Sequence, residues 1–380
     1  MRALSVAFAL WAIGCLSAAM PVRASYPVVS SVVYLAGGNS SVACPQPQNV
    51  AVDESTGEVL VPCGDAYRGL PLGGGARILP IDEQACPIVE AWSVSPDTSI
   101  LVAGCMFGSA GTLALALNDS TAQPLSLTNN TFATAAAAFP RDDRILLAKP
   151  LVFPPQSDAS LLSVSVDGSS QKVLAWDGEC SNPPIALDVN NDVLWVVCNH
   201  SLAIMDSHTG AITKRVPVPP QLTASGLLTV QFVPASGRLY VFNVHIPAYF
   251  LVGELDPATG QWRVLRNNLT CAGSTIFAET PLPSFLFLAC DNDAPDAPAL
   301  IAVDIHLQSD SVWDSSRDSP VTTDVPYVVL LNASVCNNGG AGIVSAAWRP
   351  QTSEVIMSCP LQGLIAVKLD FDEQERVALF

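Results

Sequence analysis

The stretch from Cys180 to Gly210 reads CSNPPIALDVNNDVLWVVCNHSLAIMDSHTG, and its pattern decides the fold. Three short apolar runs alternate with turn residues, at Pro184–Asp188, Leu194–Cys198 and Leu202–Asp206. Runs of this length between Asn, Asp and Gly turns predict antiparallel strands in tight succession. A fourth run, Thr213–Val216, follows directly, so this part of the chain predicts one four-stranded sheet.

The same pattern recurs along the chain and is marked by cysteines. Five cysteine pairs have spans of 19, 19, 18, 19 and 23 residues: Cys44 with Cys63, Cys86 with Cys105, Cys180 with Cys198, Cys271 with Cys290, and Cys336 with Cys359. So regular a period is typical of a repeated supersecondary unit. Two further copies lack cysteines, and Lys149 and Asn243 stand where the second cysteine would be. The repeat therefore occurs seven times.

Seven repeats of four strands predict an all-β fold, a seven-bladed β-propeller of four-stranded antiparallel blades stapled by disulfides. One such sheet cannot bury both of its faces alone, whereas a closed ring of sheets buries them all. A tandem of all-β sandwiches is the structural alternative, but it does not explain the uniform cysteine span. The single propeller domain is expected over residues 25–380, with blades near 44–82, 86–127, 132–176, 180–217, 226–267, 271–330 and 336–380.

We name the strands of each blade A to D in chain order, from the axis outward. Each first cysteine is expected to open strand A and each second one to close strand B, so both lie at the open end of one hairpin. They are within disulfide reach if they face each other in a non-hydrogen-bonded pair. This predicts five disulfides, each inside its own blade, on the rim formed by the D-to-A and B-to-C connections. Each bridge is expected to contribute about 3 kcal/mol.

Two features near the chain ends concern ring closure and an insertion. The segment 26–35 precedes Cys44 as a D strand would, and it is expected to complete the seventh blade from the other end of the chain. Residues 376–380 compete for that role. The stretch from Trp313 to Val325 has little apolar periodicity and is interpreted as an insertion in the sixth blade.

The N-terminus has the pattern of a signal peptide over residues 1–24. Arg2 is followed by an apolar stretch and by small residues ahead of a cleavage site after Ala24. An uncleaved anchor is the alternative, but the apolar run is shorter than the ~18 to 20 residues that span a bilayer. Cleavage removes Cys15 and leaves ten cysteines. The expected destination is the secretory-pathway lumen or the outside of the cell, with no membrane insertion after signal cleavage.

Six sequons are candidate glycosylation sites in that compartment, since each has Ser or Thr two residues on and no intervening proline. They are Asn39, Asn118, Asn129, Asn199, Asn268 and Asn332.

Composition narrows the possible partners. The formal net charge is -17, so nucleic acid and anionic membranes are poor partners for the surface. Hydrophobic residues make up 49% of the chain and charged residues 13%, which fits many buried strands. The remaining partner classes are a protein or a small-molecule ligand on a face of the propeller.

Short motifs at the expected A-to-B turns carry a family resemblance. Val94-Ser95-Pro96-Asp97, Phe232-Val233-Pro234 and Trp348-Arg349-Pro350 each precede an apolar run. In these motifs the chain resembles the broad NHL, YVTN and SMP-30-like group of propellers over nearly its whole length. The resemblance implies functions that range from protein and ligand binding to calcium- or zinc-dependent lactone hydrolysis. Fold does not choose among them.

The hydrolase alternative needs several oxygen ligands for a metal near one mouth of the channel. Counting four residues past the first cysteine of each repeat, Glu90 is the sole carboxylate, and Asn49 or Gln231 could assist it. One carboxylate does not make a metal cage. No catalytic residue or cofactor is therefore assigned, and a weak calcium or zinc site at these three residues is the alternative.

Other polar residues have structural interpretations. Asp53 and Asp188 end strand A, where Asp accepts hydrogen bonds from turn amides. An Asp likewise ends strand C in several blades; in the first repeat it is Asp82, at the end of the expected third strand Ala76–Asp82. The glycine run Pro71–Gly75 is interpreted as a flexible B-to-C loop. Trp92 and Trp348 in inner strands are expected to pack between blades.

The sequence thus favours a secreted, glycosylated propeller acting as a non-catalytic binding or scaffold module. The alternative is an SMP-30-like metal-dependent hydrolase or lactonase with a site at the channel mouth.

Overall fold

The structure is a computed structural model. It describes residues 27–37, 40–95, 97–106, 109, 111–127, 136–148, 161–174, 185–198, 201–223, 228–233, 236–243, 250–267, 275–277, 285–290, 296–305, 322–324, 327–336, 345–359 and 362–371. The predicted signal peptide, residues 1–24, lies outside them.

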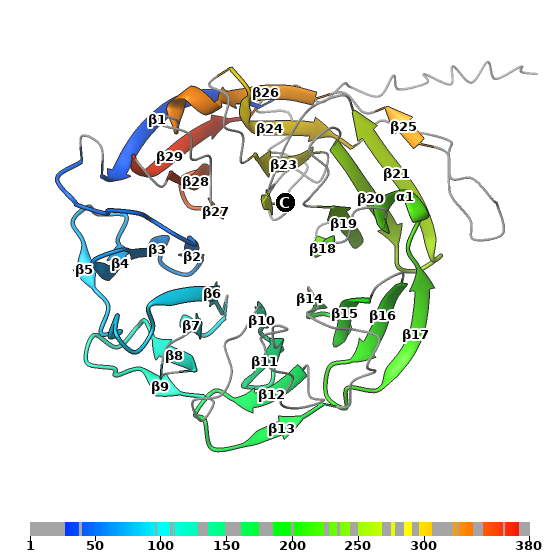
Figure 1. The fold of residues 1–380 in the computed structure, drawn as a ribbon, viewed down its shortest axis with the longest axis horizontal. Helices are drawn as coiled ribbons and strands as arrows, with labels where there is room; N and C mark the ends of the chain where they lie inside the picture. The colour runs from blue at the N-terminus through cyan, green and yellow to red at the C-terminus, as the bar shows by residue number, and fades with distance from the viewer. Residues whose placement is uncertain are drawn as a thin grey trace, which may run out of the picture.

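Seven sheets surround a central axis, with the A strands innermost and the D strands outermost (Figure 1). Blade one consists of β2 (Ala51–Asp53), β3 (Glu58–Cys63), β4 (Ala66–Leu70) and β5 (Arg77–Ile78). Blade two consists of β6 (Ile88–Val94), β7 (Ile100–Met106), β8 (Thr112–Ala116) and β9 (Leu125–Ser126). Blade three consists of β10 (Ala136–Ala138), β11 (Arg144–Ala148), β12 (Leu161–Ser165) and β13 (Gln171–Val173). Within each sheet, consecutive strands pair antiparallel. The seven-bladed propeller predicted from the repeat is confirmed.

Blades four to six follow around the ring. Blade four consists of β14 (Ile185–Asp188), β15 (Val193–Cys198), β16 (Ser201–Asp206) and β17 (Ile212–Pro217). Blade five consists of β18 (Leu228–Val233), β19 (Arg238–Asn243), β20 (Phe250–Asp256) and β21 (Gln261–Asn267). Blade six consists of β22 (Thr275–Phe277), β23 (Phe285–Ala289), β24 (Pro298–Asp304) and β26 (Tyr327–Asn332). Among the described residues, two short helices lie in connections: α1 (Pro220–Thr223) and the 3-10 helix η1 (Ala333–Val335).

The two ends of the described chain meet in the seventh blade. Strands β27 (Ser345–Arg349), β28 (Glu354–Cys359) and β29 (Gly363–Asp370) supply its A, B and C positions. The D position is taken by β1 (Val28–Ala36), which pairs antiparallel with β29 from Val28 opposite Asp370 to Ala36 opposite Leu364. An N-terminal strand therefore completes the ring. The competing segment, 376–380, lies outside the described residues.

Closure brings two glycines against each other. Gly363 has φ +103°, and a Cβ built on it would overlap the main chain of Ala36 and Gly37. Gly37 has φ +73° and would meet Gly363 in the same way. Only glycine combines this backbone conformation with so close an approach of two chains.

The first blade corrects one strand assignment. The third strand, expected at Ala76–Asp82, is instead β4 (Ala66–Leu70), because Gly64 and Asp65 form a tight turn directly after β3. Residues 77–78 form the fourth strand. The glycine run Pro71–Gly75 therefore lies in the C-to-D connection, and Asp82 follows the D strand instead of ending the C strand.

The sixth blade contributes a strand to its neighbour. Within the stretch interpreted as an insertion, β25 (Thr322–Asp324) pairs in parallel with β21, the outer strand of blade five, with Thr322 opposite Val264. The outer strand of a blade leaves an unpaired edge that can accept another strand. Strand β25 thus lies along the outside of the ring, beside β21 (Figure 1).

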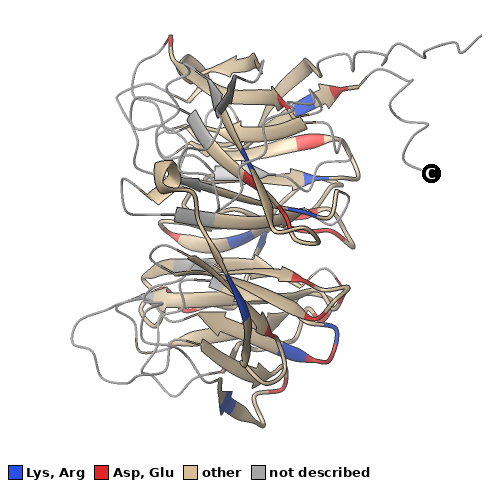
Figure 2. Ribbon diagram, turned by 90° about the vertical axis from the view of Figure 1, so that its right-hand side faces the viewer, with Lys and Arg blue, Asp and Glu red and all other residues tan. Residues whose placement is uncertain are grey.

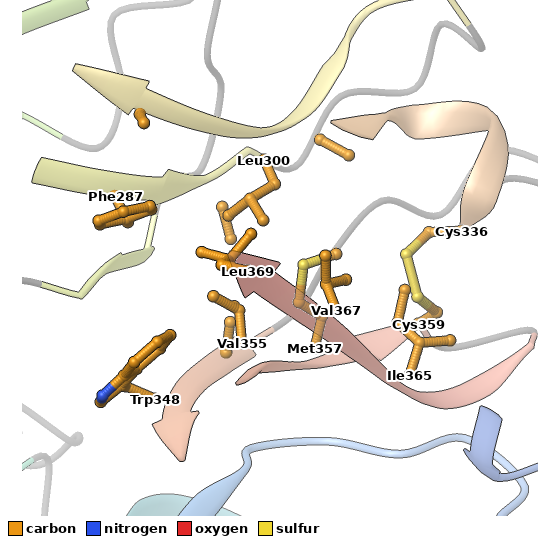
Figure 3. Close-up of a cluster of buried hydrophobic side chains, with 14 of the residues drawn as sticks. Phe287, Leu300, Cys336, Trp348, Val355, Met357, Cys359, Ile365, Val367 and Leu369 are labelled. Carbon is orange, nitrogen blue, oxygen red and sulfur yellow. A yellow bond between two sulfur atoms is a disulfide. The ribbon is translucent and has the colours of Figure 1, made fainter. Parts of the chain in front are cut away.

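The hydrophobic core is divided into seven clusters, one at each boundary between neighbouring blades. Successive residues of one strand enter different clusters. Leu194 and Val196 pack toward blade three, whereas Trp195 and Val197 pack toward blade five. Because both faces of each sheet are covered, the described B and C strands are apolar over most of their length, with charged residues such as Glu58 and Arg144 at strand ends. Figure 3 shows the cluster between blades six and seven, where Phe287 and Leu300 lie near Val355 and Leu369.

Three arginines connect neighbouring blades by hydrogen bonds to the main chain. Arg77 of blade one donates to Leu117 O at 3.3 Å, Arg144 of blade three to Ser207 O at 3.0 Å, and Arg263 of blade five to Ile305 O at 2.9 Å. Each acceptor is the residue that follows strand C of the next blade. Polar contacts thus supplement the apolar clusters at these boundaries.

Three disulfides are described, each inside one blade. They are Cys44–Cys63, Cys86–Cys105 and Cys336–Cys359, with Cα separations of 4.8, 4.8 and 5.1 Å. Cys198 and Cys290 are also disulfide-bonded, while Cys180 and Cys271 lie outside the described residues. Such bridges are consistent with an oxidising compartment, as in the secretory pathway or outside the cell.

The expected register at the disulfides was wrong. Cys63 is opposite Pro47 and Cys105 is opposite Val89, so neither is opposite its disulfide partner. Cys44 and Cys86 instead precede their A strands, and the connection carries each of them back to the end of strand B.

The disc has two faces. The disulfide face is formed by the D-to-A and B-to-C connections, which include Cys44, Cys86 and Cys336. The turn face is formed by the A-to-B and C-to-D turns, such as residues 54–57 and 207–211. Figure 2 shows Asp and Glu residues of the described turns gathered on the right-hand face of the disc. Among the described residues, no helix is long and apolar enough to cross a membrane.

Candidate axial binding site

A cavity of about 390 Å³ lies on the propeller axis, within the range typical of small-ligand sites. Its described wall comes from the inner strands of six blades, namely one to five and seven, and from the residues that directly follow some of those strands. Inner strands run from the disulfide face toward the turn face. The cavity therefore lies at the turn-face end of the axis, since Glu54, Phe139 and Val189 each follow the last residue of an A strand.

Most residues of the described wall are apolar and six of them are alanines, while polar and apolar atoms contribute about equally to its exposed surface. Ala51, Ala138, Ala186 and Ala346 contribute to it from four different blades. The same four alanines also pack in the clusters between blades, where each is 7 to 9% exposed. The cavity wall and the blade boundaries thus share residues of the inner strands.

Larger and polar side chains give the wall its specific features. Phe139, Phe232 and Trp348 are aromatic, while Glu54, Ser93 and Gln231 are the polar residues of the described wall. Of these, Glu54 is the ionisable one. The chamber therefore combines apolar surface with a single described carboxylate.

Glu54 is placed by the A-to-B turn of blade one and by blade seven. Its main-chain oxygen accepts a hydrogen bond from Gln351 Nε2 across the blade boundary. Its side chain is exposed at the turn face, yet partial desolvation, followed by the negative charges of Asp53 and Asp97, raises the pKa of Glu54 above its usual range. A neutralising cation beside this carboxylate would relieve that repulsion.

Asp53, the neighbour of Glu54, is a structural residue of the turn. It is 1% exposed and accepts hydrogen bonds from Ser55 N at 3.1 Å, Ser55 Oγ at 2.8 Å and Thr56 Oγ1 at 2.8 Å. Ser99 Oγ of blade two donates to the same carboxylate at 3.2 Å. Asp53 thus joins the turns of two blades, and the interpretation of this Asp as a turn residue is confirmed.

The same role recurs in other blades. Asp188 accepts from Asn190 N at 3.1 Å and from Asn191 Nδ2 at 2.7 Å. Asp206 accepts from Thr209 N at 2.7 Å and Thr209 Oγ1 at 2.8 Å, and these bonds lower its pKa. These aspartates stabilise turns in the described chain.

The three residues of the weak metal candidate have different surroundings. Glu90 lies in β6 at a register irregularity between Val89 and Ala91, and its side chain lies outside the description. Asn49 donates from Nδ2 to Val89 O at 2.9 Å, which ties blade one to blade two. Gln231 lines the cavity from blade five. A calcium or zinc site at these residues stays a prediction.

The described part of the chain contains no group of three His, Cys, Asp or Glu side chains arranged to hold a metal ion. His208 lies on the turn face, with Nδ1 3.1 Å from Asp142 Oδ2 and with a hydrogen bond to Arg144 at 2.5 Å. His200, His245 and His306 lie outside the described residues.

The two inner-strand tryptophans differ in role. Trp92 stacks on Tyr67 of blade one, with ring centroids 5.7 Å apart, and donates from Nε1 to Leu60 O at 2.9 Å. Its predicted packing between blades is confirmed. Trp348 meets Phe371 edge-on at 6.1 Å in the cluster between blades six and seven, and it also lines the cavity.

The candidate glycosylation sites are only partly described. Asn118 and Asn332 are exposed, in the C-to-D turn of blade two and at the end of β26. Asn39, Asn129, Asn199 and Asn268 lie outside the described residues. Glycosylation stays a prediction at all six positions.

Comparison with known proteins supports the propeller fold but identifies no family and no activity. No protein-family model matches the chain, and no curated protein matches it in sequence. A chain in a structure of the mitotic checkpoint complex is similar at a TM-score of 0.61 and 12% identity, covering 98% of this chain and 100% of that one. At such identity the likeness shows a β-propeller fold and no activity.

Two further solved structures are similar in the same way. The hydrazine synthase of Kuenenia stuttgartiensis has a TM-score of 0.58 and 12% identity, covering 88% of this chain and 99% of that one. A catalytically inactive virginiamycin B lyase from Staphylococcus aureus, solved with quinupristin, has a TM-score of 0.55 and 11% identity, covering 90% and 99%. The class defined by these findings is the β-propellers, and the NHL- and YVTN-like resemblance holds at the level of the fold.

Proposed function

We propose that this protein is a secreted, glycosylated and non-catalytic binding module. The observation that carries the proposal is the axial cavity, a chamber of about 390 Å³ lined mostly by apolar residues of the inner strands of six described blades. Pockets of this size and polarity are typical small-molecule sites. The propeller provides the scaffold and the cavity provides the place for a ligand.

The rigidity of the ring supports a binding role. Core clusters fill the blade boundaries, disulfides close individual blades, and β1 ties the N-terminal end to the last blade. A preorganised wall loses little conformational freedom when a ligand binds, which favours affinity.

Three sequence and structural features support secretion. The N-terminal pattern is that of a signal peptide, the described disulfides suit an oxidising compartment, and Asn118 and Asn332 are exposed sequons. Expression in a secreting eukaryotic cell is expected to release a protein that begins at Ser25. Its mass is expected to fall on enzymatic removal of N-linked glycans.

One observation favours a second candidate, the calcium- or zinc-dependent hydrolase. Gln231, expected to assist Glu90 at the metal, does line the cavity. In that case the metal would be held by Glu90, Asn49 and Gln231.

A single set of melting experiments separates the two functions. The mature protein is melted after EDTA treatment, then with calcium or zinc, then with a diverse set of small amines, alcohols, lactones and esters. A ligand bound only by the folded state raises the midpoint, by about 2.7 kcal/mol of added stability at a hundredfold excess over Kd. Binding without turnover, with the compound recovered unchanged by mass spectrometry, supports the module. Metal-dependent stabilisation with lactone turnover would replace it by the hydrolase.

A further inference from the structure

We propose that the axial cavity binds a small amphipathic cation, in which an apolar chain or ring lies against the inner strands and an amine lies at Glu54. The inference rests on the proposed binding function and names the class of its ligand.

The wall favours an apolar body. Most residues of the described wall are apolar, among them the partly exposed Val52, Ile185 and Leu187. Removing apolar surface from water is the main driving force for ligands in such sites. A ligand with several charged groups would leave them without partners along this wall and is disfavoured.

The charges favour a cation at one end. Glu54 is the ionisable residue of the described wall, and Asp53 and Asp97 lie close enough to act on it electrostatically. The described lining contains no Lys, Arg or His. A positive group at the mouth is therefore attracted by three carboxylates, while an anionic group is repelled by them.

The position of Glu54 gives the ligand a direction. Glu54 follows the end of β2 at the turn face, whereas Ala51 and Trp348 lie within their strands, farther along the wall. An amine at Glu54 can remain in contact with water at the turn face, and its apolar part points along the axis toward the alanines. Trp348, which also lines the wall, offers apolar contact to that part of the ligand.

Three ligands with one alkyl chain and different head groups test the charge assignment. Decylammonium, decanol and decanoate are titrated into the mature protein below their aggregation thresholds and followed by calorimetry. We expect decylammonium to bind about fivefold more tightly than decanol, which is the upper range for an exposed ion pair. Decanoate is expected to bind more weakly than decanol.

Two variants assign the preference to one carboxylate. Glu54→Gln is expected to lower decylammonium affinity to that of decanol and to leave decanol affinity unchanged. Asp296→Asn removes one negative charge from an exposed position on blade six and is expected to keep the amine preference. High salt is expected to reduce the preference in the unaltered protein.

A third variant tests whether the ligands bind in the cavity. Ala347→Phe fills the wall from blade seven and is expected to weaken all three ligands at least about tenfold if the cavity holds them. Circular dichroism and melting confirm that each variant is folded. Equal affinity for amine and alcohol, or an amine preference that survives Glu54→Gln, would overturn the inference.

The outcomes also separate this inference from the broader proposal. If decanol binds as well as decylammonium and Ala347→Phe abolishes both, the cation assignment is wrong and the cavity is still a binding site. If none of the three ligands binds, the cation assignment is wrong, and the melting screen with other compounds judges the binding module on its own.

Discussion

Arg144 of the third blade donates a hydrogen bond from Nη1 to the main-chain oxygen of Ser207 in the fourth blade, at 3.0 Å. Arg77 and Arg263 make equivalent contacts from blades one and five to the residue that follows strand C of the next blade. The side chain reaches its acceptor from different strands, from the B strand in blade three and from the D strand in blades one and five. The common feature is the acceptor at the blade boundary.

Arg77 also holds a buried carboxylate, so its loss is expected to destabilise the protein. Its guanidinium donates to Glu58 through Nε at 2.7 Å and Nη2 at 2.6 Å, and Glu58 is 7% exposed. Arg77→Met would leave that charge buried without a partner, and we expect a loss of about 2 to 4 kcal/mol in the free energy of unfolding. Denaturant titration measures this. Asp65→Asn, which breaks the exposed pair with Arg68, is the control and is expected to cost less than about 1 kcal/mol. Equal costs in the two variants would contradict the account.

Gly363 tests ring closure. Gly363→Ala places a Cβ at φ +103° against the main chain of Ala36 and Gly37, where β1 joins the seventh blade. We expect a loss of about 2 to 4 kcal/mol, because neither backbone segment can move without breaking the β1–β29 ladder. Gly73→Ala is the matched control, since a Cβ there meets nothing within 4 Å. Thermal melting that showed no difference between the two variants would contradict closure by β1.

The disulfides are expected to stay within blades. Peptide mapping under non-reducing conditions should recover Cys44–Cys63, Cys86–Cys105 and Cys336–Cys359 as described, together with Cys180–Cys198 and Cys271–Cys290. Replacing Cys44 and Cys63 together by Ala should lower stability by about 3 kcal/mol, because the closed loop no longer limits the unfolded chain. Any bridge between blades would show that the repeat assignment is wrong.

Glu54 predicts an unusual effect of pH. Desolvation, with Asp53 and Asp97, raises the pKa of Glu54 in the folded protein. An acid with a raised folded pKa costs nothing below its unfolded pKa of about 4.3 and destabilises the fold as pH rises and it ionises. Glu54→Gln is therefore expected to be more stable than the unaltered protein at neutral pH. The difference should vanish below about pH 4, as measured by melting across the pH range. A variant less stable at neutral pH would rule out this electrostatic account.

Much of the fold follows from the repeat. Seven copies, their strands and the N-terminal location of the last outer strand are recognisable because the cysteines mark equivalent positions and the apolar runs have strand length. The third strand of blade one was misplaced because the turn at Gly64 and Asp65 is only two residues long, while the glycine run that follows β4 resembles a longer loop. Nothing in the sequence of β25 indicates parallel pairing with β21, which depends on the geometry of two neighbouring blades.

The site was harder to predict. Counting from the cysteines directed attention to the start of the inner strands, near Glu90 and Asn49, whereas the cavity lies at their far end. Its wall is made by small residues such as Ala138 and Ala346, which individually look like ordinary strand residues. The available signal was the alanines recurring in the inner strands of several blades. Glu54 could not be distinguished from other turn carboxylates until the turn was seen beside the cavity.

A crystal structure of the mature protein grown with decylammonium would show directly whether the axial cavity holds such a ligand. We expect electron density for the alkyl chain in the cavity, with the amine beside Glu54 and the chain against Ala51 and Trp348. An empty cavity in crystals that hold the ligand at the disulfide face or on the outer strands would contradict it.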